Sequence, residues 1–311
     1  MLPQYIVPME PESAQEPPKD PRYLHSIKWD GVRGVVYVTS KGVRIHNRRL
    51  FDRTSTYPEL HSITEILKVE DVVLDGEIIA LDQNAKPSFW HVMKRDRIKS
   101  EEKAKKMMQK IPVYYMIFDI LYIKGESVMN RPLGERLELL REVVSEDSRR
   151  FHIVEVEECG SSLFERVRRL ELEGVVSKER DSLYYPGIKS RKWIKSKYYK
   201  KINVVVGGFS TKEGRINSLC VGAYSENQLV YLGNVSSGLS CSEFLELDRE
   251  LRKLEQPHSP FENFSPKGKG YHWVVPLLCL RVKYLEITPE GRLRSPSVVG
   301  FLKKDPQECR L

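Results

Sequence analysis

The sequence has few cysteines and no long apolar run, and both shortages restrict what the chain can be. Its 5 cysteines and 7 histidines in 311 residues are widely separated and form no C-x-x-C motif, so they predict neither a disulfide framework nor a structural metal site. The longest apolar segment, Val113 to Ile123, is too short to cross a bilayer and contains Asp119. Residues 1–12 lack Lys and Arg and are interrupted by proline, so no secretory signal is expected. We therefore expect a cytoplasmic protein without a membrane partner.

The charge balance is basic but modest. With 51 Lys and Arg against 43 Asp and Glu, the chain carries a formal charge of +8, which suits a polyanionic partner without requiring one. A hydrophobic share of 40% and a charged share of 30% are typical of a globular protein. The length predicts two domains, which we place at residues 1–200 and 201–311. Six prolines in residues 1–21 predict an extended arm on the surface.

Apolar patterning predicts both strands and helices in the first domain, which is the composition of an α+β fold. Strands are expected at 24–38, broken by a tight Asp-Gly turn, and at 72–81 and 113–123. Helices are expected at 100–110 and 134–144, and after a capping box formed by Ser162 and Glu165. A second capping box, Ser240 with Glu243, starts the helix predicted in the second domain.

After residue 203 the pattern changes to short strands separated by turn residues. We expect strands at 204–209, 219–224, 229–235 and 278–287. About one hundred residues of this kind predict a small β-barrel such as an OB fold.

Charged residues interrupt the predicted strands, and a buried charge costs several kcal/mol unless it is paired or used. Lys28 is followed by Asp30 and Arg33, and its amine can act as a nucleophile once its neutral form becomes accessible. Arg33 can bind a phosphate or carboxylate through two hydrogen bonds. An ion-paired hairpin is the alternative interpretation.

Three further interruptions belong to the same set. Asp75-Gly76-Glu77 places two carboxylates on one strand face, which suits ribose hydroxyls or a divalent cation; a solvent-facing turn is the alternative. Phe118, beside Asp119, can stack on a base, although such a ring is more often part of a core. Glu173-Gly174-Val175-Val176-Ser177-Lys178 brackets a strand with a carboxylate and a lysine, as a surface ion pair also would. One shared site explains these interruptions better than separate accidents.

A basic segment extends from Gly187 to Arg215, with nine Lys or Arg and one acid. Lys195 and Lys197, two residues apart, project to the same face of a strand and suit a polyphosphate. A solvated basic edge strand is the alternative.

In this order and spacing, the five segments resemble those of the covalent nucleotidyltransferases, the superfamily of ATP-dependent DNA ligases and RNA capping enzymes. The nearest resemblance is to the ligase domain of the bacterial end-joining ligases. It extends from about Met9 to the C-terminus, and further segments support it, namely Tyr57-Pro58-Glu59-Leu60, Tyr184-Tyr185-Pro186-Gly187 and Gly291-Arg292-Leu293-Arg294.

The resemblance implies a role for each matching residue of the site. Lys28 would form a phosphoamide with AMP, and Phe118 would stack on adenine. Glu77 would bind the ribose, and Glu173 together with Glu77 would serve a catalytic Mg²⁺ or Mn²⁺ ion.

The resemblance also assigns basic residues to phosphates. Arg33 and Arg48 would contact the nucleotide or the 5′-phosphate of the DNA. Lys195 and Lys197 would contact the α-phosphate of ATP.

The fold and activity that follow from the resemblance are specific. The fold is an α+β adenylation domain with mainly antiparallel sheets, followed by an OB-fold β-barrel. The activity is sealing of 5′-phosphate/3′-hydroxyl breaks in nicked or broken duplex DNA through lysyl-AMP, in repair, recombination or non-homologous end joining. We expect a monomer associated with the nucleoid, with a Ku-type end-binding protein as a partner.

Two positions depart from the family pattern. Ser26 stands where relatives have a Glu two residues before the lysine, and Leu302-Lys303-Lys304 lacks the arginine of the last motif, which lysine cannot replace in a bidentate contact. The alternatives are an RNA ligase or capping-type enzyme, which shares the lysine motif, and a non-catalytic nucleic-acid-binding scaffold.

Overall fold

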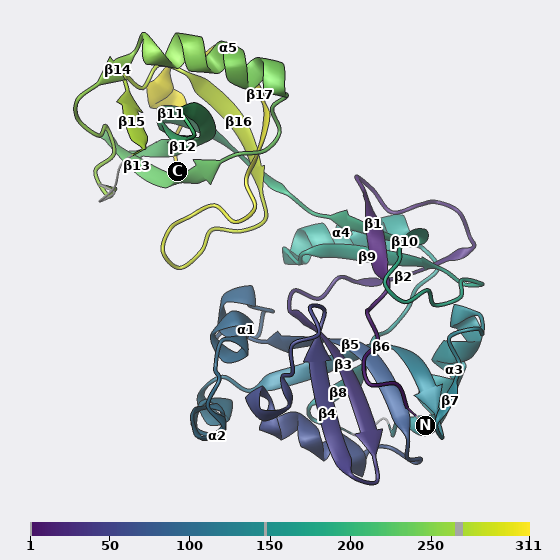
Figure 1. Cartoon of the computed structure of the whole chain (residues 1–311). Helices are drawn as coiled ribbons and strands as arrows, with labels where there is room; N and C mark the ends of the chain where they lie inside the picture. The colour runs from purple at the N-terminus through teal and green to yellow at the C-terminus, as the bar shows by residue number, and fades with distance from the viewer. Residues whose placement is uncertain (1, 146–147, 265–269) are drawn as a thin grey trace. The chain divides into compact units, whose positions relative to one another are not determined.

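A computed structural model describes residues 2–145, 148–264 and 270–311. The chain forms two compact units, Met1–Tyr198 and Tyr199–Leu311 (Figure 1). Within the described ranges, no helix is both long and apolar enough to span a bilayer.

The N-terminal unit contains a six-stranded sheet, which we call the large sheet. Its strands are antiparallel except for β8, which runs parallel to β6. In spatial order they are β4 (Gly42–Asn47), β3 (Val32–Thr39), β5 (Val72–Ala80), β6 (Val113–Ile123) and β7 (Glu126–Ser127), with β8 (Phe151–Ile153) beside β6.

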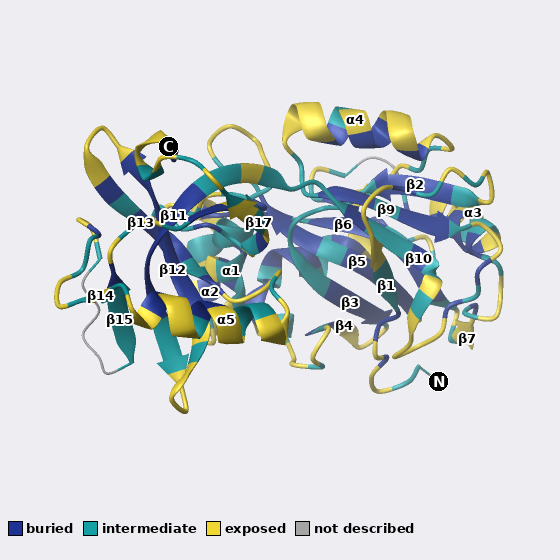
Figure 2. Ribbon diagram, turned by 90° about the horizontal axis from the view of Figure 1, so that it is seen from above, coloured by how far each residue is buried: buried dark blue, intermediate teal, exposed yellow. Residues whose placement is uncertain are grey.

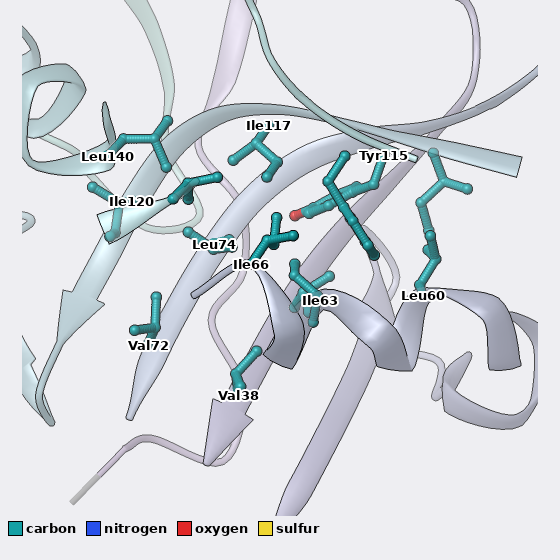
Figure 3. Close-up of a cluster of buried hydrophobic side chains, with 14 of the residues drawn as sticks. Val38, Leu60, Ile63, Ile66, Val72, Leu74, Tyr115, Ile117, Ile120 and Leu140 are labelled. Atoms are coloured by element: carbon teal, nitrogen blue, oxygen red, sulfur yellow. The ribbon is translucent and has the colours of Figure 1, made fainter. Parts of the chain in front are cut away.

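The main core lies on one face of the large sheet. Five helical segments belong to this part of the unit: η1 (Thr54–Thr56), η2 (Pro58–Glu65), α1 (Phe89–Asp96), α2 (Glu101–Lys110) and α3 (Leu133–Val143). Figure 3 shows Leu60 and Ile63 of η2 pointing toward Leu74 and Tyr115 of the sheet. The opposite face is covered as well, by residues such as Trp193. Burial of both faces explains why β6 is almost continuously apolar in sequence.

A second, four-stranded sheet packs on that opposite face, and we call it the small sheet. Its order is β1 (Glu10–Ala14), β10 (Lys189–Lys197), β9 (Gly174–Glu179) and β2 (Tyr23–Ile27). Helix α4 (Gly160–Leu170) covers its outer side, with exposed residues facing away from the sheet (Figure 2).

The prediction of a surface arm at residues 1–21 is wrong in part. Residues 10–14 form β1, which runs parallel to β10 at the edge of the small sheet. Ile6 and Met9 are buried between the sheets, against Tyr37 and Trp193. Ile6 and Met9 are therefore core residues, whereas Tyr5 and Val7 are exposed, and an extended proline-rich segment suits an edge strand.

The Asp30-Gly31 turn joins two strands as predicted, but it does not form a hairpin. Strand β2 pairs with β9 in the small sheet, whereas β3 pairs with β4 and β5 in the large sheet. A Cβ on Gly31 would lie 2.2 Å from the Ile78 carbonyl oxygen, so only glycine allows this crossing. The segment that carries Lys28 therefore connects the two sheets.

The predicted capping box at Ser162 is also wrong. Helix α4 begins earlier, with Cys159 at its N-cap and no side-chain cap. Gly160 packs against the His25 ring, where a Cβ would come within 2.6 Å. Tertiary packing therefore sets the start of this helix, whereas the Ser240–Glu243 capping box of α5 is confirmed.

The C-terminal unit is a seven-stranded antiparallel sheet around its own core. Helix α5 (Cys241–Arg252) contributes Leu247 and Leu251 to that core. The strands are β11 (Lys200–Lys212), β12 (Arg215–Ser225), β13 (Gln228–Val235), β14 (Glu255–Gln256), β15 (Tyr271–Val274), β16 (Cys279–Tyr284) and β17 (Ser297–Leu302), and a short η3 (Pro306–Glu308) follows. The mainly antiparallel fold class predicted for the chain is confirmed.

Candidate active site

The carboxylate of Glu173 lies between two lysine ammonium groups. It accepts a hydrogen bond from Lys28 Nζ at 2.6 Å and pairs with Lys197 Nζ at 2.8 Å. Its side chain is 4% exposed and that of Lys28 is 21% exposed. Backbone pairing produces this arrangement, because Lys28 N–H donates to the Gly174 carbonyl at 2.9 Å and Lys197 lies opposite Gly174 in the β10–β9 ladder. Three residues predicted from separate motifs thus meet.

The charged groups in this cluster shift one another's pKa values. Burial lowers the pKa of Lys28, but the carboxylates of Glu173 and Glu77 outweigh burial and raise it overall. Burial likewise raises the pKa of Glu173, but Lys28 and Lys197 outweigh it and lower the pKa. For Lys195, burial, then Lys197 and Lys28, all lower the pKa. The Lys28 amine therefore carries its proton in the unliganded site.

Glu77 approaches the same cluster from the large sheet. It lies on β5 directly opposite Arg33 of β3. Burial raises the pKa of Glu77 to about 7, opposed by the charges of Lys28 and Arg33. Its neighbour Asp75 is buried, which rules out the alternative of a solvent-facing turn. The predicted Glu77 and Lys28 are thus close neighbours that come from different sheets.

Arg33 is a cation that several hydrogen bonds hold in a fixed position beside the site. Its Nε and Nη2 each donate to the Asp75 carboxylate at 2.5 Å, and its Nη2 also donates to the Met9 carbonyl at 3.3 Å. Tyr184 Oη donates to the same carboxylate at 2.6 Å. The Asp75 carboxylate raises the pKa of Arg33, so this guanidinium is always charged. Its predicted contact with the nucleotide or 5′-phosphate would add to these bonds, and it stays a prediction.

Phe118 is half-buried between two cations. Arg33 Cζ lies 4.6 Å and Lys178 Nζ 4.1 Å from the centroid of its ring. Lys178 Nζ also lies 4.0 Å from the Trp193 centroid and donates to the Phe118 carbonyl at 3.2 Å. Burial lowers the pKa of Lys178 to about 7. Lys178 therefore fixes the position of Phe118, the ring predicted to stack on a base.

A small apolar pocket lies beside this ring. Its two polar side chains are Ser26 and Lys178, and Phe118 forms part of its wall. Its other lining residues are Leu24, Leu133, Leu137, Val154 and Val156. Ser26 is two residues before Lys28, and alternate residues of a strand point to the same face. The pocket therefore lies on the Ser26 side of β2, close in the chain to Lys28, and its apolar walls and few polar groups are typical of a base-binding site.

Asp119, the neighbour of Phe118, has a structural role. Its carboxylate accepts from Arg136 Nε at 2.7 Å and Nη2 at 2.9 Å, and both side chains are buried. Arg136 also donates to the Arg131 and Ser182 carbonyls. This network ties β6 to α3 and to the segment that follows β9.

Two predicted elements lie outside the cluster. Arg48 follows β4, is 56% exposed, and pairs with Glu10 at 3.3 Å. In the C-terminal unit, Leu302 ends β17 opposite Cys279, and Lys304 Nζ pairs with Glu308 at 3.0 Å.

Across the described ranges, no group of three or more His, Cys, Asp or Glu side chains is arranged to hold a metal ion. A site with two carboxylates, such as Glu77 and Glu173, nevertheless suits Mg²⁺, which binds one or two carboxylates and completes its shell with water and substrate phosphates. Burial disfavours the charged form of Glu77, and a cation would relieve this penalty. The residues present therefore fit a divalent ion that arrives with its substrate.

Comparisons with known proteins agree with this geometry. Residues 10–197 match the ATP dependent DNA ligase domain, and residues 212–305 match the ATP dependent DNA ligase C terminal region. The chain belongs to the ATP-dependent DNA ligase family. This confirms the predicted fold class, an adenylation domain followed by a C-terminal domain of the OB type.

Individual relatives place it near the end-joining ligases. It is 34% identical over 292 residues to the multifunctional non-homologous end joining protein LigD of Mycobacterium bovis, covering 90% of this chain and 36% of that protein. It is 30% identical over 303 residues to a DNA ligase of Thermococcus fumicolans, covering 91% of this chain and 52% of that ligase. The chain thus spans between about a third and a half of these relatives.

A solved structure extends the match over nearly the whole chain. The ligase domain of LigD from M. tuberculosis is 32% identical, with a TM-score of 0.56 over 98% of this chain and 97% of that domain. A mycobacterial DNA ligase D complexed with ATP and MES matches with the same scores.

Lys178 is a residue of the site to which the sequence motifs assigned no role. It pairs with both Leu24 and Trp193 across the small sheet. Alternation alone places Lys178 on the face of Val176, toward the large sheet, and a lysine on an inward face is the signal that could have identified it.

Proposed function

We propose that this chain is an ATP-dependent DNA ligase that seals 5′-phosphate/3′-hydroxyl breaks in duplex DNA through a lysyl-AMP intermediate. The Lys28–Glu173 contact at 2.6 Å, with Lys197 on the same carboxylate, carries this proposal. The family names of its relatives support it. A non-catalytic scaffold has no use for a buried Glu173 held between Lys28 and Lys197, since burying these charges costs free energy.

Self-adenylation is the first step. The Lys28 ammonium must first lose its proton, and a divalent cation bound nearby would favour the neutral amine. The neutral amine then attacks the α-phosphorus of ATP in line with the bond to pyrophosphate, which breaks. Lys195 and Lys197 stabilise the negative charge on the non-bridging oxygens. Glu77 binds the ribose, and Phe118 with Lys178 holds the base in the pocket.

Sealing follows in two further transfers. The AMP moves from Lys28 to the 5′-phosphate of the break, which Arg48 contacts, and the 3′-hydroxyl then displaces AMP as the new phosphodiester bond forms. Glu173 and Glu77 would hold Mg²⁺ or Mn²⁺, which supplies neutralisation of phosphate charge when bound. Contacts to the DNA backbone make binding independent of sequence and sensitive to salt.

The test is one assay in two stages. The purified chain is incubated with α-labelled ATP or GTP and a divalent metal, and then with a nicked DNA duplex or a nicked RNA duplex. We expect label on the protein from ATP, sealing of the DNA nick, and loss of both after chelation of the metal. Label from GTP, or sealing of RNA alone, would instead identify a capping-type enzyme or an RNA ligase.

The biological setting is a further part of the proposal. The names of the LigD relatives support a role in non-homologous end joining. We propose that the chain acts as a nucleoid-associated monomer that a Ku-type end-binding protein recruits to broken ends. Light scattering of the purified chain tests the monomer, and co-purification with a Ku-type protein on broken DNA tests the recruitment.

A further inference from the structure

A loop at the end of β4 exposes an aromatic ring beside two arginines. Phe51 is 55% exposed, and Arg48 and Arg49 precede it. A single exposed apolar side chain is normal on a protein surface and needs no explanation by itself. The loop formed by residues 47–53, however, holds this ring outward, and the following contacts show how.

Asn47 closes the 47–53 loop through its side chain and backbone. Its Oδ1 accepts from the Arg49 N–H at 3.0 Å and from the Phe51 N–H at 3.1 Å. Its own N–H donates to the Phe51 carbonyl at 3.1 Å. Leu50 completes the turn in the left-handed region, with φ of 63°. Because both backbone polar groups of Phe51 are used, the part of the backbone that carries the ring is held in place.

The guanidinium of Arg53 lies beside the Phe51 ring. Arg53 Cζ lies 5.7 Å from the ring centroid. The Arg53 guanidinium is held by the Asp96 carboxylate at 2.9 and 3.4 Å, and Tyr57 Oη donates to the same carboxylate at 3.1 Å. The ring is therefore presented from a rigid support, so that binding through it costs little conformational entropy.

The 47–53 loop lies at the end of the large sheet that carries the active site. Gly34 pairs with Asn47 on one side and with Gly76, the neighbour of Glu77, on the other. Arg48 links the loop to Glu10 of the small sheet. These connections tie the 47–53 loop to the strands that carry Arg33 and Glu77, and to the small sheet.

We propose that Phe51 detects the break in the duplex by stacking on the base pair that the break exposes, while Arg48 and Arg49 bind the flanking phosphates. An intact duplex offers phosphates but no free π-face, whereas a nick or an end can open one. Phe51 is thus a positioning residue for sealing, and this inference rests on the proposed ligase function.

The test compares Phe51→Ala and Phe51→Trp with Leu170→Ala, a control on α4 whose side chain is 52% exposed. Dissociation constants are measured at one salt concentration for a nicked and an intact duplex of the same sequence. We expect Phe51→Ala to weaken binding to the nicked duplex about tenfold and to leave the intact duplex unchanged. Phe51→Trp should retain the preference, and Leu170→Ala should change neither constant.

A 2-aminopurine base beside the nick gives a second readout. Its fluorescence should be quenched by the wild-type chain and by Phe51→Trp, but not by Phe51→Ala. The inference is overturned if Phe51→Ala weakens both duplexes equally, weakens neither, or still quenches the probe. Label transfer from ATP should be the same in all these proteins. Absence of label in the wild-type chain would refute the ligase proposal itself, which keeps the two failures distinguishable.

Discussion

The two units bury different kinds of side chain. The N-terminal unit buries charged residues, among them Asp75, Arg95, Asp119, Arg136 and Lys178. In the described part of the C-terminal unit, the buried polar side chain is Ser218, and the rest of the interior is apolar or aromatic or contains cysteine.

The difference reflects what each unit has to hold in place. A buried charge costs several kcal/mol unless it is paired, and the N-terminal unit pairs its charges through two-pronged arginine contacts to Asp75, Asp119 and Glu59. Such pairs have one geometry, so they position Lys28, Glu77 and Phe118 more rigidly than apolar packing can. Among its described residues the C-terminal unit buries no charged side chain, so its core needs none of these pairs.

The largest expected effect is the loss of activity on removal of Lys28, whose charged side chain is predicted to react rather than to support the fold. Lys28→Ala should lower label transfer from ATP and overall sealing about ten-thousandfold or more, because no other group can form the phosphoamide. Mass spectrometry after incubation with ATP measures the adduct directly. Lys106→Ala, an exposed lysine on α2, is the control and should behave as wild type. An adduct on the Lys28→Ala protein would refute the assignment of the nucleophile.

The next effect concerns the carboxylate between the lysines. Glu173→Gln keeps the shape but removes the charge, and we expect sealing to fall about a hundredfold or more while the thermal unfolding midpoint changes little. Titrating the metal in the sealing assay measures the effect. Glu179→Gln, at the other end of β9, serves as the control. Normal sealing by Glu173→Gln at ordinary Mg²⁺ concentration would contradict the role proposed for this residue.

Arg136→Met should show that the framework pairs act through stability. It leaves the Asp119 carboxylate buried without its partner, which we expect to cost roughly 3–5 kcal/mol of unfolding free energy. Urea denaturation followed by tryptophan fluorescence measures this cost.

The matching change in the C-terminal unit is Arg281→Met, which removes an exposed contact to Asn203 at 3.1 Å and should cost less than about 1 kcal/mol. Equal costs in the two units would remove the contrast between them. In the N-terminal unit, adding Asp119→Leu to Arg136→Met should recover part of the unfolding free energy that Arg136→Met loses, because no unpaired carboxylate then stays buried.

The last effect, smaller than that of Arg136→Met, is a pH dependence of stability from Lys178. Its pKa is about 7 in the folded chain, below its ordinary value, because burial and the charge of Arg33 outweigh the opposing carboxylate of Asp119. At pH values between this folded-state pKa and the ordinary pKa of lysine, the unfolded chain binds more protons than the folded chain. The free energy of unfolding of the wild type therefore rises as the pH rises.

Lys178→Met lacks this dependence. Its stability relative to wild type should therefore be higher near pH ~7 than near pH ~9.5, by roughly 1–3 kcal/mol. Urea unfolding of both proteins at the two pH values measures the difference. A constant difference would show that Lys178 does not titrate in this range.

Much of the site could be predicted because its residues interrupt apolar strands. Glu77 and Phe118 stand inside segments that are otherwise apolar, and this local context is enough to single them out as candidates. The roles of Arg33 and Lys178 could not be separated in this way. Both are basic residues in strands, and only their surroundings, an Asp75 carboxylate for one and two aromatic rings for the other, distinguish them.

Local fold errors have the same origin. The N-terminal prolines indicated an arm, and Ser162 indicated a helix start, because local signals were the only ones that the sequence offers. The structure that each segment adopts depends on partners distant in the chain. Residues 10–14 pair with β10, and Gly160 packs against His25.

The sequence by itself determined the chemistry of this protein. Residue types, their order and their apolar context single out a candidate lysine nucleophile, carboxylates and cations suited to phosphate, because these properties belong to the side chains, and their roles stay predictions. Only the tertiary structure decided which charges meet. Lys28, Glu77 and Glu173 come from segments far apart in the chain, and their contacts and pKa values depend on distance and burial, which exist only after two sheets have packed together.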